Sequence, residues 1–347
     1  MVYDENGYVD MASIIKRNMT FNFLIGGRGT GKTYGALKYV VENNVKFILM
    51  RRTQTQLDSI ARTDTNPFKS VFRDMGTDWT YEPQPAGKSI YAFQVATFDE
   101  EIGKIAYGAT VGYGISLTTV ANLRGFDMSD AEMLIYDEFI PETHERAIKN
   151  ESDAFFNCYE TINRNREIQG KKPIQLLALA NANDFACPLL IGLNLVSTVE
   201  KMIRSGKTEY INPQKSVGIY LLTDSPISQK KAETALYKLT TGTAFSDMAI
   251  KNAFAGTEDP DVCSVNIQDY NPVVGVGELC IYRHKSLSSY YVSTHYSGSV
   301  GRYSGDGIDM KRFFGSHKNI IISAISGKVI YESHLAKALF FRYCGFD

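Results

Sequence analysis

The residues best suited to chemistry lie in a glycine-rich stretch at positions 26–33, Gly-Gly-Arg-Gly-Thr-Gly-Lys-Thr. Its spacing is G-x-x-x-x-G-K-T, in which glycines permit positive φ angles, so that successive backbone N–H groups can surround phosphate oxygens. Lys32 supplies positive charge to the terminal phosphates, and the Thr33 hydroxyl ligates Mg²⁺. The stretch therefore predicts a nucleotide-binding P-loop made of Gly26, Gly27, Arg28, Gly29, Thr30, Gly31, Lys32 and Thr33.

The elements that a P-loop requires flank this stretch. Apolar residues 21–25 predict a buried strand before it, and the spacing of Leu37, Val40 and Val41 predicts a helix over 32–42 after it. The positive end of that helix faces the same anion. A glycine-rich turn in an unrelated α/β protein is the alternative, and the strand-loop-helix context counts against it.

A second motif follows about a hundred residues later, at 133–140, Met-Leu-Ile-Tyr-Asp-Glu-Phe-Ile. The apolar run predicts a buried strand that ends in two acids, as in a Walker B motif. Asp137 then lies at the strand's C-terminal edge, where it can hold Mg²⁺ opposite Thr33, and Glu138 can polarise the attacking water. Such a dipeptide is also common as a solvated strand end, but its pairing with a P-loop favours the catalytic interpretation.

Further polar residues follow the next helix and strand. Residues 151–169 have apolar side chains at helical spacing and a polar tip that carries Arg164 and Arg166. Residues 174–180 predict another buried strand, and it ends at Asn181. This asparagine can hydrogen-bond a γ-phosphate or the lytic water, although asparagine is also a common turn former.

Composition limits the classes of protein to which the chain can belong. The chain has 347 residues, 44% hydrophobic and 22% charged, which predicts a well-packed globular protein of two domains, or of one domain with a substantial appendage. The net charge of −1 means that any contact with nucleic acid depends on local basic patches. Five widely spaced cysteines without a C-x-x-C argue against a disulfide framework or zinc site. The absence of an 18-residue apolar run or a basic leader predicts no membrane segment.

The order of apolar and polar runs along the chain predicts an α/β protein. We expect a P-loop domain over 1–200 with a central, mostly parallel sheet to which 79–117 add antiparallel strands, a linker at 201–230, and a small β-rich α+β domain over 231–347. In the last domain, residues 320–325 are predicted as a strand. If the protein contacts nucleic acid, three basic pairs are the candidates for its phosphates: Arg51 with Arg52, Arg62 with Lys69, and Lys171 with Lys172.

Taken together, the motifs resemble those of the DNA-packaging ATPases of phi-29-like small tailed podophages and, more loosely, of the large terminase subunits. The resemblance covers most of residues 20–185. It rests on the P-loop with its internal arginine, Phe-Ile-Leu-Met-Arg-Arg at 47–52, Ile-Tyr-Asp-Glu-Phe-Ile at 135–140, Asn-Arg-Asn-Arg-Glu at 163–167 and Leu-Ala-Asn-Ala at 179–182. The C-terminal third is similar only in size, order and β-rich character.

The resemblance implies a RecA-like ATPase of the ASCE type and a C-terminal domain like an RNase H nuclease that has lost its active site. Such proteins form homo-oligomeric rings, usually pentamers, on the procapsid portal in the host cytoplasm, and they hydrolyse ATP with Mg²⁺ at subunit interfaces to drive double-stranded DNA inward. The sequence leaves open the stoichiometry and the use of a structural RNA. The implied catalytic residues are Lys32, Arg28, Glu138 and Asn181, with Arg164 acting in trans and Arg124 and Arg166 as further basic candidates.

Two alternatives remain at this stage. In a nucleotide-gated switch, hydrolysis only resets a conformation; Asn-Ala-Asn-Asp at 181–184 is similar to the N-K-x-D guanine motif but lacks its lysine, and Glu138 favours hydrolysis. In a cleaving terminase, the C-terminal domain is an active nuclease. The strands over 273–296 carry one acid, Glu278, where a two-metal site needs several, and Asp306, Asp309 and Glu332 are the remaining carboxylates considered for such a site.

Overall fold

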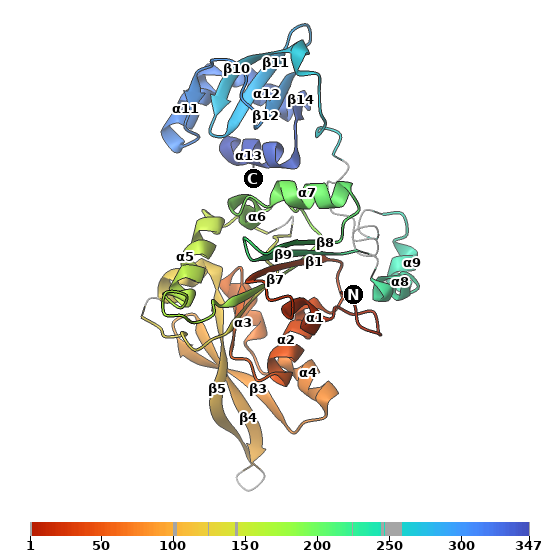
Figure 1. Cartoon of the computed structure of the whole chain (residues 1–347), viewed down its shortest axis with the longest axis vertical. Coiled ribbons are helices and arrows are strands. Elements are labelled where there is room, and N and C mark those ends of the chain that lie inside the picture. Colours follow the sequence, from red (N-terminus) through yellow and green to blue (C-terminus); the bar gives the residue numbers. More distant parts are fainter. Residues whose placement is uncertain are drawn as a thin grey trace. The chain divides into compact units, whose positions relative to one another are not determined.

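The computed structural model describes residues 2–99, 103–123, 125–142, 145–223, 225–243, 246 and 259–346 (Figure 1). The chain divides into two compact units. The first contains residues 1–184 and 202–255, and the second contains residues 185–201 and 256–347.

The first unit is built on a nine-stranded sheet with the order β3-β4-β5-β2-β6-β7-β1-β9-β8. The six strands from β5 to β9 in this order pair in parallel, and the β3–β4, β4–β5 and β8–β9 pairs are antiparallel. The predicted parallel sheet with antiparallel additions is therefore confirmed. The strands are β1 (Phe21–Gly26), β2 (Phe47–Arg51), β3 (Trp79–Gly87), β4 (Ile90–Asp99), β5 (Lys104–Ser116), β6 (Met133–Asp137), β7 (Gln175–Asn181), β8 (Glu209–Asn212) and β9 (Val217–Leu222).

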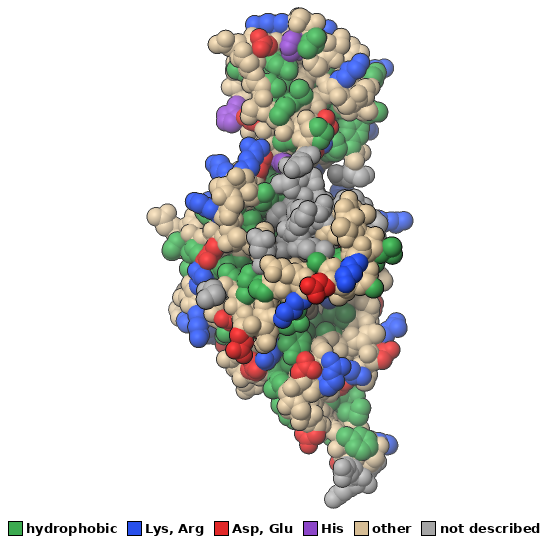
Figure 2. Space-filling view, turned by 90° about the vertical axis from the view of Figure 1, so that its right-hand side faces the viewer, with side chains coloured by type: hydrophobic (Ala, Val, Ile, Leu, Met, Phe, Trp, Pro, Cys, Tyr) green, Lys and Arg blue, Asp and Glu red, His purple; other side chains and the backbone are tan. Residues whose placement is uncertain are grey.

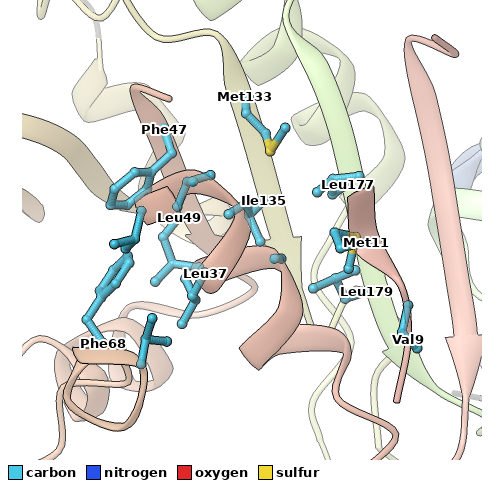
Figure 3. Close-up of a cluster of buried hydrophobic side chains, with 14 of the residues drawn as sticks. Val9, Met11, Leu37, Phe47, Leu49, Phe68, Met133, Ile135, Leu177 and Leu179 are labelled. Carbon is cyan, nitrogen blue, oxygen red and sulfur yellow. The ribbon is translucent and has the colours of Figure 1, made fainter. Parts of the chain in front are cut away.

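The central strands are buried along nearly their whole length because helices cover the sheet (Figure 1). Figure 3 shows one such layer, in which Leu37 of helix α2 faces Leu49 of β2 and Ile135 of β6. Continuous apolar runs are the expected sequence of strands covered on both faces. The helices of this unit are α1 (Met11–Ile15), α2 (Lys32–Glu42), α3 (Gln54–Ile60), α4 (Phe68–Met75), the 3-10 helix η1 (Leu117–Leu123), α5 (Glu151–Asn163), α8 (Pro226–Ala232) and α9 (Ala235–Leu239).

The predicted linker at 201–230 is wrong for most of its length. Residues 217–222 form β9, which pairs in parallel with β1, and β8 is the edge strand beside it. All six residues of β9 are buried, so this segment is part of the core of the first unit. Charged residues and turn formers flank this segment, so the sequence pattern did not indicate a strand there. Conversely, residues 185–200, predicted within the first domain, belong to the second unit.

The second unit has a five-stranded sheet with the order β13-β10-β11-β12-β14. Its core includes Leu279, Ile281 and Val292 from the sheet and Phe313 and Phe340 from helices. Its elements are α6 (Pro188–Gly192), most of α7 (Val196–Arg204), the 3-10 helix η2 (Ile267–Asp269), β10 (Tyr270–Val276), β11 (Leu279–His284), β12 (Tyr290–Ser293), β13 (Arg302–Tyr303), α11 (Gly307–Ser316), α12 (Lys318–Ile325), β14 (Val329–Tyr331) and α13 (His334–Cys344).

The strand predicted at 320–325 is wrong, because these residues form helix α12. Ile320 packs in the core, whereas the side chains of Ile322 and Ile325 are mostly exposed. A short apolar run has no clear period, so burial cannot be assigned to one face from the sequence. In the described part of the chain, no helix is both long and apolar enough to cross a membrane.

Candidate active site

The sheet topology brings the sequence motifs to one edge. Strands β6, β7 and β1 are neighbours and run parallel, with Asp137 beside Leu179 and Gly26 beside Asn181. Their C-terminal ends therefore lie together, at the place where open parallel sheets bind ligands. The P-loop, the two acids and Asn181 thus form one site, as the sequence predicted.

The P-loop has the backbone that its glycines predict. Gly29 has φ 73° and Gly31 has φ 87°, and both values are strained for other residues. Gly26 is required for a different reason, because a Cβ built there would lie 2.4 Å from the Cβ of Leu222 in β9. Strand β9, which the sequence analysis did not foresee, therefore packs directly against the start of the loop.

Lys32 is folded back onto the loop that precedes it. Its ammonium donates to the carbonyl oxygens of Gly26 at 3.0 Å and Gly27 at 2.8 Å, with the Thr30 hydroxyl at 3.4 Å and Asn181 Oδ1 at 3.5 Å. Burial lowers the pKa of Lys32 to about 8, opposed by the charge of Asp137. A buried ammonium held only by neutral oxygens is ready to exchange them for phosphate oxygens, which carry the opposite charge.

Thr33 and Asp137 face each other across the loop. The Thr33 hydroxyl donates to the Asp137 carboxylate at 3.0 and 3.1 Å, and the side chain of Asp137 is 5% exposed. A hydroxyl and a carboxylate are hard oxygen donors of the kind that Mg²⁺ prefers beside nucleotide phosphates. These two residues therefore fit the predicted metal site.

Glu138 is held by an arginine that the sequence analysis did not assign to the site. Arg51, the last residue of β2, pairs with Asp137 at 3.0 Å and with Glu138 at 2.7 Å. Glu138 has φ 60°, an uncommon backbone conformation for a glutamate, and its side chain is 47% exposed. The backbone thus turns the Glu138 side chain out of the strand, where Arg51 pairs with both acids and offsets part of their charge.

The remaining predicted residues complete an open cleft of about 350 Å³. Arg28 extends from the P-loop and forms an ion pair with Glu142, and both line the cleft. Asn181 lines it from the end of β7. A larger cavity of about 450 Å³ lies at the opposite edge of the sheet, beside the first residues of β6 and β7, and contains none of the predicted phosphate ligands.

The structure places the basic tip of helix α5 far from this cleft. Arg164 follows the helix with φ 49°, and its guanidinium contacts the Phe126 carbonyl at 3.4 Å and Asp127 at 3.5 Å. Arg166 donates to the carbonyls of Ser129 at 3.2 Å, of Lys172 at 2.9 Å and of Ala131. These segments precede β6 and β7, so both arginines lie at the sheet edge opposite Glu138. Arg124 lies outside the described residues.

Arg51 and Arg52 are not a DNA-binding pair, and that prediction is wrong. Arg51 is engaged with the two acids, and the side chain of Arg52 is fully buried. Arg52 makes a bidentate contact with Glu151 at 2.8 and 2.9 Å and also pairs with Glu145. The sequence pattern indicated two solvent-exposed arginines at a strand end. It could not show their acidic partners, because these lie about 90 to 100 residues later in the chain.

The other proposed basic pairs are exposed: Arg62 with Lys69, and Lys171 with Lys172. On the face in Figure 2, cationic and anionic side chains are interspersed, which agrees with a net charge of −1. On this face, contact with phosphates would therefore depend on small local groups of cations.

The three C-terminal carboxylates considered for a nuclease site have separate structural partners. Asp306 caps helix α11, Asp309 accepts from the backbone and hydroxyl of Ser304, and Glu332 accepts from Thr294 and its neighbours. Within the described residues, no three His, Cys, Asp or Glu side chains gather in a way that would hold a metal ion.

Comparison with known proteins identifies the family. A model described as podovirus DNA encapsidation protein (Gp16) matches residues 3–273. The chain belongs to this family. Among its relatives, the DNA packaging proteins of Bacillus phages phi29 and PZA are each 24% identical over 259 residues, which cover 73% of this chain and 68% of theirs.

Solved structures agree with the fold across both units. The Phi-28 gp11 DNA packaging motor has a TM-score of 0.64 at 17% identity, with 98% of each chain covered. The chain from the bacteriophage Phi-29 genome packaging motor assembly has the same score and identity, with 97% and 99% covered. Family membership therefore makes this chain a DNA packaging protein, and its candidate site is built on a P-loop.

Proposed function

We propose that this chain hydrolyses ATP in the cleft between β1, β6 and β7, and that a homo-oligomeric ring of such chains on the procapsid portal uses the reaction to move double-stranded DNA inward. The observation that carries the proposal is the apposition of the Thr33 hydroxyl and the Asp137 carboxylate, with Glu138 next in the chain. This arrangement combines a phosphate loop, a metal site and a base, which a binding module does not need.

In this mechanism the loop N–H groups bind the β-phosphate, and the Lys32 ammonium leaves the loop carbonyls for phosphate oxygens. Thr33 and Asp137 would hold Mg²⁺, which when bound neutralises phosphate charge and orients the phosphates for in-line attack. Asn181 is placed to hydrogen-bond the γ-phosphate or the attacking water.

Glu138 orients that water and accepts its proton. To do so, its carboxylate must leave Arg51, with which it pairs at 2.7 Å in this structure. Hydrolysis by this route therefore requires that the ion pair between Arg51 and Glu138 opens.

Arg164 acts on the site of a neighbouring subunit. Helix α5 has 13 residues, and a rise of about 1.5 Å per residue makes it about 20 Å long. Because Arg164 lies beyond its far end, at the opposite sheet edge from Glu138, it is badly placed to reach its own γ-phosphate. An arginine supplied in trans typically raises turnover by about 10³ to 10⁵. Its strained φ and half-exposed guanidinium support such a role.

Two single variants separate binding from chemistry. Lys32→Ala removes charge that faces the phosphates and should weaken ATP binding, whereas Glu138→Gln should leave binding intact and stop turnover. Calorimetric titration of MgATP and a phosphate-release assay measure the two quantities. Equal loss of nucleotide affinity in both variants would contradict the assigned roles.

A mixing experiment tests the ring. Arg164→Ala subunits, inactive alone, should regain part of their ATPase activity when mixed with Glu138→Gln subunits, because some interfaces then combine an intact glutamate with an intact arginine. Lys171→Ala, an exposed cation near the same tip, is the matched control and should stay active by itself. If mixed rings recover no ATPase activity, or if Arg164→Ala is fully active alone, Arg164 does not act in trans.

A further inference from the structure

A second lysine reaches the P-loop from a helix far along the chain. Lys231 of α8 donates from its ammonium to the carbonyl oxygen of Arg28. A Cβ built on Gly29 would lie 2.1 Å from the same nitrogen, so the ammonium lies directly against the loop backbone. None of the sequence motifs includes this residue.

The start of helix α8 is fixed beside the loop. Ser225, which is fully buried, donates to the Gly7 carbonyl at 2.9 Å, and Pro226 packs so closely on Gly7 that a Cβ there would lie 2.7 Å away. The preceding strand β9 pairs with β1, which leads into the P-loop. The position of Lys231 is therefore set by the buried sheet and by a buried hydrogen bond, rather than by a free surface side chain.

Three cations consequently crowd one loop: Arg28, Lys32 and Lys231. Burial lowers the pKa of Lys231, and the nearby Arg28 charge lowers it further. The charges of Lys231 and Arg28 in turn contribute to the lowered pKa of Lys32. Glu142 offsets the charge of Arg28, but the three cations still repel one another in a partly desolvated place, and a polyphosphate would relieve that repulsion.

We propose that Lys231 is a further phosphate ligand of this site, whose ammonium moves from the Arg28 carbonyl to an oxygen of the terminal phosphates when ATP binds. The backbone of Gly29, which it touches, is part of the loop that surrounds those phosphates. Four rotatable side-chain bonds allow the short movement. The inference rests on the proposed function, because it requires that the P-loop binds ATP.

The alternative role for Lys231 is mechanical, in which its hydrogen bond only holds the loop in shape. Lys231→Gln separates the two roles, because an amide can still donate to the Arg28 carbonyl but carries no charge. Lys231→Met removes both the donor and the charge, and Lys231→Arg keeps both. Lys230→Met, which changes the exposed neighbouring lysine of the same helix, is the matched control.

The test is calorimetric titration of the full chain with MgATP and MgADP. Lys231→Met and Lys231→Gln should each weaken MgATP binding by about tenfold or more, as expected for a lost hydrogen bond between charged groups. Lys230→Met and Lys231→Arg should bind nearly as the original chain does. Unchanged affinity in Lys231→Met, or affinity retained in Lys231→Gln, would overturn the assignment.

Two controls keep the result interpretable. If Lys231→Met lowers the unfolding temperature strongly, the comparison of Lys231→Gln with Lys231→Arg decides, because both keep a donor and differ in charge. Lys32→Ala reports on the proposed function itself. If Lys32→Ala weakens MgATP binding and the Lys231 variants do not, only this inference fails. If none of these variants weakens MgATP binding, the proposal that ATP binds at the P-loop fails as well.

Discussion

The buried position of Lys32 predicts an unusual pH dependence of ATP binding. In the unliganded site its pKa is about 8, because burial disfavours the ammonium. Bound phosphates favour the charged form, so binding requires a protonated Lys32. At pH 9 only about one molecule in eleven carries that proton, and the dissociation constant for MgATP should rise about eightfold between pH 7.5 and pH 9.

Folding stability should change in the opposite direction over the same range. The pKa of Lys32 in the folded chain is below its ordinary value of 10.5. The unfolded chain therefore binds more protons above pH 8, and the Lys32 contribution to the free energy of unfolding rises with pH. A general loss of structure at high pH would instead lower affinity and stability together, so the two measurements distinguish the causes.

Calorimetry in two buffers with different ionisation enthalpies directly measures the number of protons taken up when MgATP binds. Near pH 9, binding of MgATP should take up close to one proton, and near pH 7.5 the uptake should be much smaller. The full-length chain at constant ionic strength is required, because screening also changes phosphate affinity. An unchanged dissociation constant between pH 7.5 and pH 9, with no proton uptake, would refute the reasoning.

Three further outcomes are expected. Arg52→Met leaves buried Glu151 without its bidentate partner and should lower the free energy of unfolding by about 3–5 kcal/mol, measured by denaturant titration. Gly26→Ala drives a methyl group into Leu222, so nucleotide affinity should fall in a binding assay. Affinity for double-stranded DNA should fall steeply with salt and vary little with sequence, because the contacts are to phosphates; salt-independent or sequence-selective binding in a titration would contradict this.

The sequence predicted the parts of the site that are contiguous in the chain. The P-loop and the acidic strand end each carry their own spacing, and both lie at strand ends where parallel topology collects ligands. Asn181 followed from the same argument, since a buried strand precedes it. These predictions needed only local pattern and one rule about parallel sheets.

Arg51 and Lys231 needed information that no local pattern contains. Arg51 meets the two acids because β2 is the neighbour of β6, and strand order was not visible in the sequence. Lys231 reaches the loop because β9 pairs with β1, whereas that segment was predicted as a linker. The first omission came from an unknown strand order, and the second came from a strand that was predicted as a linker.

The central claim is that this chain is a DNA-dependent ATPase that uses Glu138 as its base. The most direct measurement is the rate of phosphate release from MgATP by the assembled protein, with and without double-stranded DNA, for the original chain and for Glu138→Gln. We predict that DNA raises turnover in the original chain, and that Glu138→Gln binds MgATP but shows almost no turnover in either condition. Equal turnover in both chains, or a rate that DNA does not change, would contradict the account.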